Sequence, residues 1–576
     1  MKIFDKNKIC SFSNMRFLGL QPFYSDWNFD PLFNYSAEFN FFAGFIGWIH
    51  IIQFSLITLS LLILTIYLPR KVESLQFLHR IGFGYLLLNF WLTTIDRPVR
   101  FALKEELSLE NILAIFQEDP FLFHLFFLYG TAIVAAFFYG ILDQFFIKNG
   151  DEIEFPLLVC FLAIGVLLLL HVHTLIEFLL AIETVTLASY VFAGYERQNP
   201  HSTYASVQYF ILGSIPSGML VLSLSLLYAY AGTLTFEDLD MFIFQDVKEN
   251  IFDFSLQDMQ FYSVYPLLWN EEFWIVSDSL NVISNSNLTE EFLSSRTPAL
   301  IVALFLILFN LLFKLTAAPF HFWAPSVYKY APIASVTYLS IMSKMMVIFL
   351  LFKILLVVFY PFMVIINPLL FIIAVLSILI GMLGAFSERY IKPFFVYSSM
   401  GHVGFMLVSL SLFTFSGISA TFHYLAIYIV SSFIMWFILL HLGSTTTALS
   451  SFKDLRKTDP ILALIFALLI FSMSGLPPLG GFFIKLDVLS AFLETSHFAS
   501  NMLLFLFTVA SFFYYLRVNK ILFFDKIKIT NFKKRNGISS ERFQLISVFF
   551  LLLLFYPLFV ESSLLLMQSE ILLSLF

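Results

Sequence analysis

Residues 309–332 read FNLLFKLTAAPFHFWAPSVYKYAP. They contain a lysine and a helix-breaking segment inside an otherwise apolar stretch. Lys314 follows an apolar run, and Thr316-Ala-Ala-Pro319 comes almost directly after it. Proline removes a backbone hydrogen bond and clashes with the preceding turn, so a helix is interrupted there. Unwound backbone at membrane depth persists only where it faces protein or a wet cavity. The stretch therefore predicts a broken membrane helix that carries a buried charge.

The composition places the whole chain in a membrane. Of its 576 residues, 59% are hydrophobic and only 12% are charged, and the mean hydropathy is +0.87. A soluble domain would carry roughly 25% charged residues, and a spanning helix needs about 20 apolar residues. We therefore expect an all-α polytopic membrane protein with about fourteen transmembrane helices. The apolar segments are 41–68, 79–95, 121–147, 155–171, 174–195, 203–230, 298–320, 332–360, 361–386, 391–414, 417–442, 459–495, 499–524 and 543–572.

A second interrupted helix matches the first. Gly475-Leu-Pro-Pro-Leu-Gly-Gly481 lies a few residues before Lys485, in the twelfth segment. Paired broken helices in corresponding halves are typical of inverted-repeat transporters. We therefore expect two inverted five-helix repeats, helices 4–8 and 9–13, with helices 7 and 12 broken. The expected domains are an N-terminal extramembrane segment (1–40), helices 1–3 (41–147), the two antiporter-like repeats (155–360 and 361–524), and a basic loop with a C-terminal helix (525–576).

The charges in the loops predict the orientation. Most of the 32 Lys and Arg residues fall in loops of one side, which is the inner side by the positive-inside rule. Both termini should then lie on the outer side, which is the periplasm or the mitochondrial intermembrane space. The one long hydrophilic insertion, 233–297, is acidic, with Lys248 and Arg296 as its only basic residues. It could dock a partner or be a solvated insertion, and the sequence leaves both open.

The sequence holds no recognisable redox or nucleotide site. Cys10 and Cys160 are too few for a four-thiolate iron–sulfur centre, and there is no CxxC, dinucleotide fingerprint or P-loop. We therefore expect no cofactor and no metal. The 76 Phe residues suit a lipid-facing surface encoded by an AT-rich genome, which hints at an organelle. Because the N-terminus also lacks a signal-peptide core, we expect the mitochondrial inner membrane, with a bacterial plasma membrane as the alternative.

Five ionisable residues lie in separate apolar segments and form an ordered series. An ionisable group at the bilayer centre costs roughly 2.5–3.5 kcal/mol, so such a group marks function by default. Desolvation disfavours a charged lysine and a nearby carboxylate favours it, so a glutamate–lysine pair can act as a switch. Spaced through a bundle, such groups can relay protons. The expected relay comprises Glu183, Lys314, Lys344, His402 and Lys485.

A structural interpretation of these charges is also open. Glu183 and Lys314 could form a static buried ion pair that locks two helices together, although this does not explain the other three members of the series. Lys353 lies near a helix end and can extend its ammonium to the interface, so we interpret it as structural. The roles of Glu177 and Asp487 are left open.

Several strings together resemble one family of membrane subunits. They are YFILGSIPSG at 209–218, FKLTAAPFHFWAPSVYKYAP at 313–332, YIKPFFVYSSMGHVGF at 390–405, GLPPLGGFFIK at 475–485 and YYLRV at 514–518. These strings and their order are similar to those of the second-subunit family of NADH:ubiquinone oxidoreductase, respiratory complex I, over about residues 155–520. The resemblance implies an antiporter-like subunit that translocates protons, while other subunits oxidise NADH and reduce ubiquinone.

The same resemblance implies partners and residue roles. The partners would be the other membrane-arm subunits, including neighbouring antiporter-like ones, and lipids, with no direct NADH binding and no nucleic acid. The five charges are similar to the family's helix-five glutamate, helix-seven lysine, helix-eight lysine, helix-ten histidine and helix-twelve lysine, in the order Glu183, Lys314, Lys344, His402 and Lys485.

The chain departs from the family pattern at a few positions. Gln208 stands where the family usually has a lysine, and Ser326 where it has an aspartate after Trp-Ala-Pro. None of the departures touches the five central charges, but Gln208 removes one possible relay charge. The alternatives are a subunit of a multi-chain monovalent cation/proton antiporter, which shares this fold, and a structural scaffold of the same complex. The intact charges argue against the scaffold.

Overall fold

The computed structural model describes residues 59–60, 63, 155–170, 172–196, 199–236, 238–243, 297–359, 362–442, 448–494 and 498–524. The chain divides into two contact units, Met1–Gln53 and Phe54–Phe576, and all the described residues belong to the second. The expected N-terminal segment (1–40), nearly all of helices 1–3 (41–147), most of the acidic loop (233–297) and the C-terminal segment (525–576) lie outside the described residues.

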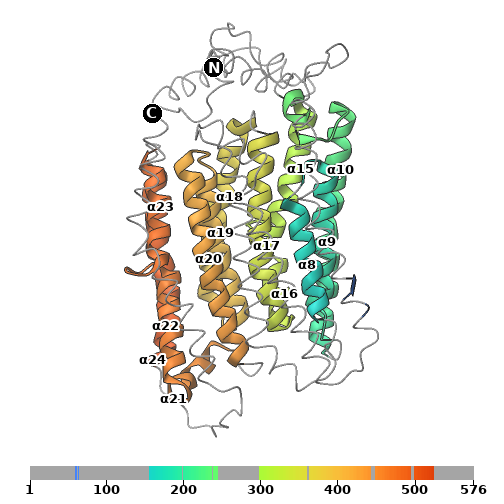
Figure 1. Cartoon of the computed structure of the whole chain (residues 1–576). Coiled ribbons are helices and arrows are strands. Elements are labelled where there is room, and N and C mark those ends of the chain that lie inside the picture. The colour runs from blue at the N-terminus through green and yellow to red at the C-terminus, as the bar shows by residue number, and fades with distance from the viewer. Residues whose placement is uncertain are drawn as a thin grey trace, which may run out of the picture. The chain divides into compact units, whose positions relative to one another are not determined.

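The described part of the chain is helical, and its helices run side by side (Figure 1). The helices before the acidic loop are α8 (Phe155–Leu170), α9 (Leu175–Ala193) and α10 (Pro200–Ala231). After it come α15 (Thr297–Leu315), α16 (Trp323–Tyr330) and α17 (Ile333–Lys353), which continues as a π-helix over Ile354–Val358. They are followed by α18 (Met363–Ser387), α19 (Ile391–Leu410) and α20 (Phe415–Leu442). A 3-10 helix (Leu449–Asp454) then leads to α21 (Leu455–Thr458), α22 (Pro460–Ser474), α23 (Gly480–Glu494) and α24 (Phe498–Phe523).

The helices have the length and composition of membrane spans, as expected. Among the described residues, seven helices are long and apolar enough to cross a membrane. Two shorter apolar helices, Ala299–Leu315 and Pro460–Ser474, are the first halves of the broken helices. The only β contacts of the described residues are two isolated bridges, Thr174 with Thr235 and Tyr390 with Ala448. The all-α membrane class is therefore confirmed, and the remaining expected spans lie outside the described residues.

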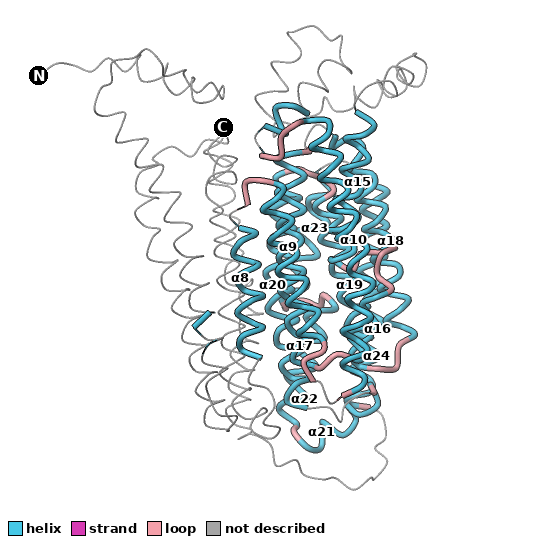
Figure 2. Tube along the Cα trace, turned by 90° about the vertical axis from the view of Figure 1, so that its right-hand side faces the viewer, coloured by secondary structure: helices cyan, strands magenta, loops and turns pink. Residues whose placement is uncertain are grey.

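Both expected helix breaks are present. The segment 298–320 is not one helix, because α15 ends at Leu315 and α16 begins only at Trp323. The segment 459–495 is likewise divided into α22 and α23 around Gly475. Figure 2, in which loops are pink, shows the described chain as long helices with loops at their ends and at the breaks. Each break places unpaired backbone groups inside the bundle, where only protein groups or water can bind them.

The start of α9 explains one acidic residue that the sequence left open. Thr174 accepts a hydrogen bond from the backbone N–H of Glu177, and the Glu177 carboxylate accepts one from the N–H of Thr174. This reciprocal capping satisfies two N–H groups that have no partner within the helix. Glu177 is thus a helix-capping residue. Nearby, Lys353 donates to the backbone oxygen of Val172 at 2.5 Å, in agreement with a structural role for this lysine.

The core of the bundle lies around α17 and α19. In the apolar stretch of each of these two helices 94% of the residues are buried, compared with 33% in the apolar stretches of α10, α18 and α24. The two most buried helices carry Lys344 and His402, two of the five expected relay residues. Their ionisable side chains are therefore enclosed by other helices on all sides, which is where membrane proteins keep functional charges.

Glycines allow α18 and α19 to approach closely. A Cβ atom added to Gly381 would lie 2.8 Å from the backbone nitrogen of Gly401 and 2.8 Å from the carbonyl oxygen of Tyr397. Both of these atoms belong to the backbone of α19 and cannot rotate away. Small residues at membrane helix interfaces have this effect, because packing rather than hydrophobicity drives association in lipid.

Replacing Gly381 by alanine should therefore force the two helices apart. We expect Gly381→Ala to lower the melting temperature of the purified chain in detergent, in line with an overpacking cost of roughly 1–3 kcal/mol. Gly218→Ala on α10 is the control, because a Cβ atom there would meet nothing within 4 Å. Equal melting temperatures for the two variants would contradict the close packing of α18 and α19.

Candidate functional site

The break between α15 and α16 keeps its backbone groups bonded to protein. The indole N–H of Trp323 donates to the carbonyl oxygen of Phe313 at 3.1 Å, and the N–H of Ala318 donates to the hydroxyl of Ser377 at 3.3 Å. Thr316 has a φ of 62°, a left-handed conformation that turns the chain out of the helix. The sequence motif thus folds as a fixed kink, and it places Lys314 at the last turn of α15.

Lys314 lies in this kink without a hydrogen-bond partner. Its side chain is 8% exposed, and its Nζ atom forms no hydrogen bond. Glu183 on α9 is close enough for its charge to act on Lys314, but its Oε1 atom is also unbonded and its Oε2 accepts only from the Thr186 hydroxyl. Glu183 and Lys314 are therefore near enough for their charges to interact, but no hydrogen bond joins them. They do not form a closed ion pair.

A third unbonded polar atom lies one helical turn from Lys314. Asn310 is fully buried on α15, and its amide nitrogen donates to the carbonyl oxygen of Pro216 at 2.7 Å, while its Oδ1 is unbonded. Residues four apart on a helix lie on the same face. Because buried polar groups are normally hydrogen-bonded, this group of unbonded atoms marks a site where polar contacts change or where water can enter.

Lys344 on α17 is bonded to a tyrosine. Its side chain is 1% exposed, and its Nζ donates to the phenolic oxygen of Tyr428 on α20 at 3.1 Å. The ammonium also lies 5.2 Å from the centroid of the Tyr428 ring, within the range of a cation–π interaction. Lys344 therefore has a neutral partner that can both donate and accept a proton.

His402 on α19 lies between two further tyrosines. Its Nδ1 is 2.8 Å from the hydroxyl of Tyr424 on α20, and its Nε2 is 2.9 Å from the hydroxyl of Tyr515 on α24. In a neutral imidazole one nitrogen donates and the other accepts, so the two phenols take opposite roles. The ring centroid of Tyr428 lies 5.6 Å from that of His402. Tyr428 thus lies against both Lys344 and the histidine.

Lys485 on α23 is bonded at the second helix break. Its Nζ donates to the carbonyl oxygen of Ser474, the last residue of α22, at 2.8 Å and to the hydroxyl of Ser511 on α24 at 3.1 Å. Gly475 has a φ of 88°, and a Cβ atom there would lie 3.3 Å from this Nζ. The break therefore needs glycine at this position, and it offers the negative end of a helix dipole to a buried cation.

Contacts connect two of the three central residues. Lys344 and His402 form one group with three tyrosines, because Tyr428 lies against both of them. Lys485 has separate partners, Ser474 and Ser511, at the second break. Glu183 and Lys314 form a second group at the other break. The sequence reasoning did not identify Tyr424, Tyr428 or Tyr515, although the first two are four residues apart on one face of α20 and the third lies in the YYLRV string.

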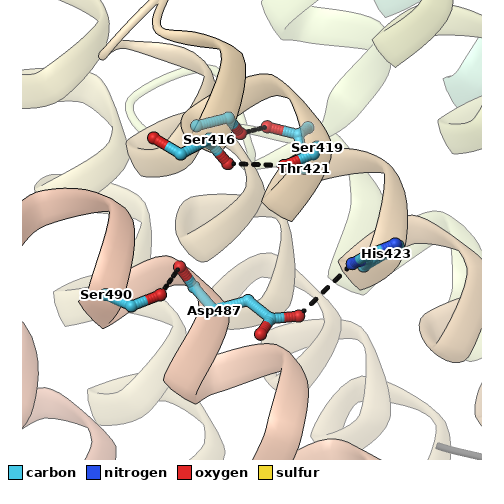
Figure 3. A network of polar contacts seen from close by, with 7 residues as sticks. Ser416, Ser419, Thr421, His423, Asp487 and Ser490 are labelled. Atoms are coloured by element: carbon cyan, nitrogen blue, oxygen red, sulfur yellow. Dashed lines mark hydrogen bonds and ion pairs between the residues drawn. The ribbon is translucent and has the colours of Figure 1, made fainter. Parts of the chain in front are cut away.

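A titratable pair lies further along α23. The Nδ1 of His423 on α20 is 3.4 Å from a carboxylate oxygen of Asp487, and both side chains are about one third exposed. Figure 3 shows the two side chains pointing toward one another from α20 and α23. Asp487 follows Lys485 by two residues, which is about 3 Å along the helix axis. Asp487, whose role the sequence left open, is thus a partner of His423 that joins α23 to α20.

Two departures from the family pattern are in direct contact. The amide nitrogen of Gln208 on α10 donates to the hydroxyl of Ser326 on α16 at 3.0 Å, across 118 residues of sequence. The resemblance to the family implies a lysine and an aspartate at these positions. A neutral hydrogen bond would then occupy the place of a pair of opposite charges. We therefore predict that the two departures are one coupled change.

This coupling can be tested with a double-mutant cycle. Gln208→Lys and Ser326→Asp alone should each destabilise the chain by roughly 1.5–3 kcal/mol, because each introduces a charge without its partner. The double variant should recover most of this loss, since the two charges then pair. The measurement is the melting temperature of the four forms in detergent. Additive effects would mean that the two positions do not interact.

In the described ranges, no three His, Cys, Asp or Glu side chains are close enough together to hold a metal ion. Cys160 on α8 is a free, buried thiol.

Similar proteins are bacterial subunits and membrane complexes of the same architecture. The chain is 31% identical to NADH-quinone oxidoreductase subunit N of Paramagnetospirillum magneticum over 428 residues, which are 74% of this chain and 78% of that protein. It is 29% identical to subunit N of Rhodospirillum rubrum over 66% of this chain and 69% of that one. By fold it is similar to a chain of respiratory complex I from Thermus thermophilus, with a TM-score of 0.62, 22% identity, and coverage of 89% of this chain and 98% of that one.

The same fold occurs in the Mrp complex from Dietzia sp. DQ12-45-1b, with a TM-score of 0.66 at 17% identity and coverage of 91% of this chain and 96% of that one. The family model described as NADH:quinone oxidoreductase/Mrp antiporter, transmembrane, matches residues 173–265 and 273–513. These ranges include both helix breaks and all five ionisable residues of the series, of which Glu183 is half-buried and the other four are buried. The chain therefore belongs to the NADH:quinone oxidoreductase/Mrp antiporter family of membrane subunits, and within it to the relatives named subunit N.

Proposed function

We propose that this chain is a membrane-arm subunit of respiratory complex I that translocates protons. The observation that carries the proposal is a group of buried contacts: Lys344 donates to Tyr428, the Tyr428 ring lies against the His402 ring, and His402 is bonded to Tyr424 and Tyr515. Lys485 is buried at the second break. Ionisable groups within membrane helices are costly and are kept where charge has to move. NADH oxidation and quinone reduction are carried out by other subunits, so this chain is a non-redox part of the enzyme.

The Glu183–Lys314 pair supplies the switch. The Coulomb energy of two charges rises as their distance falls, and it is larger in a buried site than in water. A closed pair holds the protonated lysine, and an open pair favours transfer of that proton to the next group. The unbonded Nζ of Lys314 and Oε1 of Glu183 correspond to an open arrangement. Water that enters at these atoms connects the pair to its neighbours.

The proton path follows the order of the helices. Protons enter from the inner side and reach Lys344 near the Glu183–Lys314 pair. They pass laterally through His402, whose neutral ring can take a proton at one nitrogen and release one from the other. Lys485 receives them at the second break. They leave toward the outer side, and the Asp487–His423 pair is the next titratable group in that direction on α23.

The partners and the location follow from the same assignment. The chain packs among other membrane-arm subunits, including neighbouring antiporter-like ones, and lipids. We place it in the mitochondrial inner membrane with both termini on the intermembrane-space side. The Phe-rich composition, with 76 Phe residues, supports the organelle, and the distribution of Lys and Arg among the loops supports the orientation. The relatives named above are bacterial proteins, in which the corresponding location is the plasma membrane.

Lys485→Ala should block proton translocation through this subunit. The variant removes the ammonium that is bonded to the carbonyl oxygen of Ser474 at the second break, so a proton arriving from His402 loses its acceptor there. The measurement is the number of protons moved per NADH oxidised in proteoliposomes that contain the complete complex. Lys353→Ala is the control, because this lysine is bonded to a backbone oxygen at a helix end. Full stoichiometry in Lys485→Ala would refute the proposed path.

A subunit of a multi-chain cation/proton antiporter is the second candidate, since the family and the fold include such chains. A native gel of the source membrane, stained for NADH oxidation, separates the two. We expect peptides of this chain in the active band, together with flavin and iron–sulfur subunits. Its presence only in a smaller band without NADH activity would favour the antiporter.

A further inference from the structure

A cavity lies between α21, α22 and α24, away from the buried charges. Its volume is about 1030 Å³. Its wall includes Arg456 of α21, close to the end of the bundle, and Phe471 of α22, close to the second break. These residues are 15 positions apart, mostly along α22, which corresponds to about 20 Å of helix. The cavity therefore extends from the end of the helices toward the middle of the bundle.

The polar part of the cavity is positively charged. Arg456, Arg517 and Lys520 line it, and none of the described residues in its lining is acidic. The guanidinium group of Arg456 donates to the carbonyl oxygen of Phe523 at 2.6 Å, and that of Arg517 donates to the carbonyl oxygens of Phe386 and Glu388. These bonds hold the two guanidinium groups in place. Lys520 is exposed and forms no ion pair with the described part of the chain.

Inside the cavity two polar groups have no partner. Asn519 is 5% exposed and lines the cavity, yet neither its amide nitrogen nor its amide oxygen forms a hydrogen bond. The Nε of Arg517 is also buried and unbonded. A buried polar group without a partner is destabilising, so nearly all such groups in folded proteins are bonded to protein, water or ligand. The wall of the cavity thus holds buried, unbonded donors and an acceptor beside a cluster of cations.

The deeper part of the cavity is apolar. Phe471 and Phe513 lie on facing helices, and Leu516 lies one turn from Phe513 toward the charged end. Phe513 is 56% exposed on the outer surface of α24, so the cavity opens sideways to the surrounding bilayer. Its polarity changes along its length from cationic at the helix end to apolar near the break. That is the profile of a membrane lipid, whose headgroup lies at the interface and whose chains lie below it.

We propose that this cavity binds an anionic phospholipid, with its phosphate at Lys520 and Asn519 and its acyl chains along Phe471 and Phe513. The phosphate oxygens accept hydrogen bonds from the ammonium, the amide nitrogen and Nε of Arg517, which are the groups left free in this structure. The Asn519 oxygen accepts from a headgroup hydroxyl. Basic pockets between membrane helices on the inner side bind lipids of this class, and the positive-inside rule places this end there. A free phosphate ion would use the same polar groups but would leave the apolar part uncovered.

The test uses the complete complex, purified in mild detergent and washed free of loosely bound lipid. It is incubated with mixed micelles of phosphatidylcholine with or without phosphatidylglycerol, and the phospholipid retained per complex is measured by mass spectrometry. Lys520→Gln and Asn519→Leu are compared with Lys453→Gln. The last variant makes the same charge change near this end of the bundle but does not line the cavity. A separate arm adds inorganic phosphate to the complex loaded with phosphatidylglycerol, and another carries a photo-cross-linker at position 520.

We expect Lys520→Gln to lower the retention of phosphatidylglycerol about 5-fold, the effect of one interfacial lysine, and to leave phosphatidylcholine unchanged. Asn519→Leu should also lower retention while raising the melting temperature of the lipid-free complex, because it removes an unbonded buried amide. Lys453→Gln should retain the lipid as the unchanged protein does. Equal retention in all variants would overturn the proposal. So would complete displacement of the lipid by inorganic phosphate, or cross-linking of position 520 to a polypeptide in place of lipid.

Discussion

The hydrogen bond from Lys485 to the carbonyl oxygen of Ser474 reduces two free-energy costs of the membrane interior, that of a buried charge and that of an unpaired backbone group. A buried ammonium needs acceptors, and a broken helix leaves carbonyl groups without donors. The ammonium of Lys485 supplies the donor, and the carbonyl group of Ser474 at the break supplies the acceptor. The helix break and the buried charge therefore stabilise each other. Gly475 permits this approach, because a side chain there would meet the lysine. The same constraint applies to the rest of the site, because each further buried charge also needs polar groups around it.

Neutral side chains supply most of those partners. Three tyrosines bond Lys344 and His402, and serines bond Lys485, whereas no carboxylate lies against any of these three residues within the described chain. A carboxylate would hold a lysine charged and fix its proton, but a phenol can donate or accept and leaves the proton free to move. The exception is Glu183, whose charge acts on Lys314 without a direct bond. Lys314 thus differs from Lys344 and Lys485 in having a carboxylate close enough to act on its charge.

Charged residues are distributed differently between the α10–α16 contact and the end of the bundle. Gln208 and Ser326 form a neutral hydrogen bond between α10 and α16. At the end of the bundle charge is concentrated instead, because Arg456, Arg517 and Lys520 line one cavity whose described lining contains no acidic residue. Cations are tolerated there because the interface supplies water and anionic headgroups. Charge in this protein is therefore kept where a proton moves or where the bilayer surface can compensate it.

The sequence by itself determined the membrane class, the two helix breaks and the five ionisable residues within apolar segments, because each depends on composition or on local spacing along the chain. A lysine inside an apolar run or a proline after it has one physical consequence in a bilayer, whatever surrounds it. Only the tertiary structure decided which groups meet. Tyr424, Tyr428 and Tyr515 become partners of Lys344 and His402 through contacts between helices far apart in sequence, and the unbonded state of Asn519 depends on what α21 and α22 leave open beside it. Hydrogen bonds act over about 3 Å, so they depend on the packing of helices and are not encoded in the local pattern of any one of them.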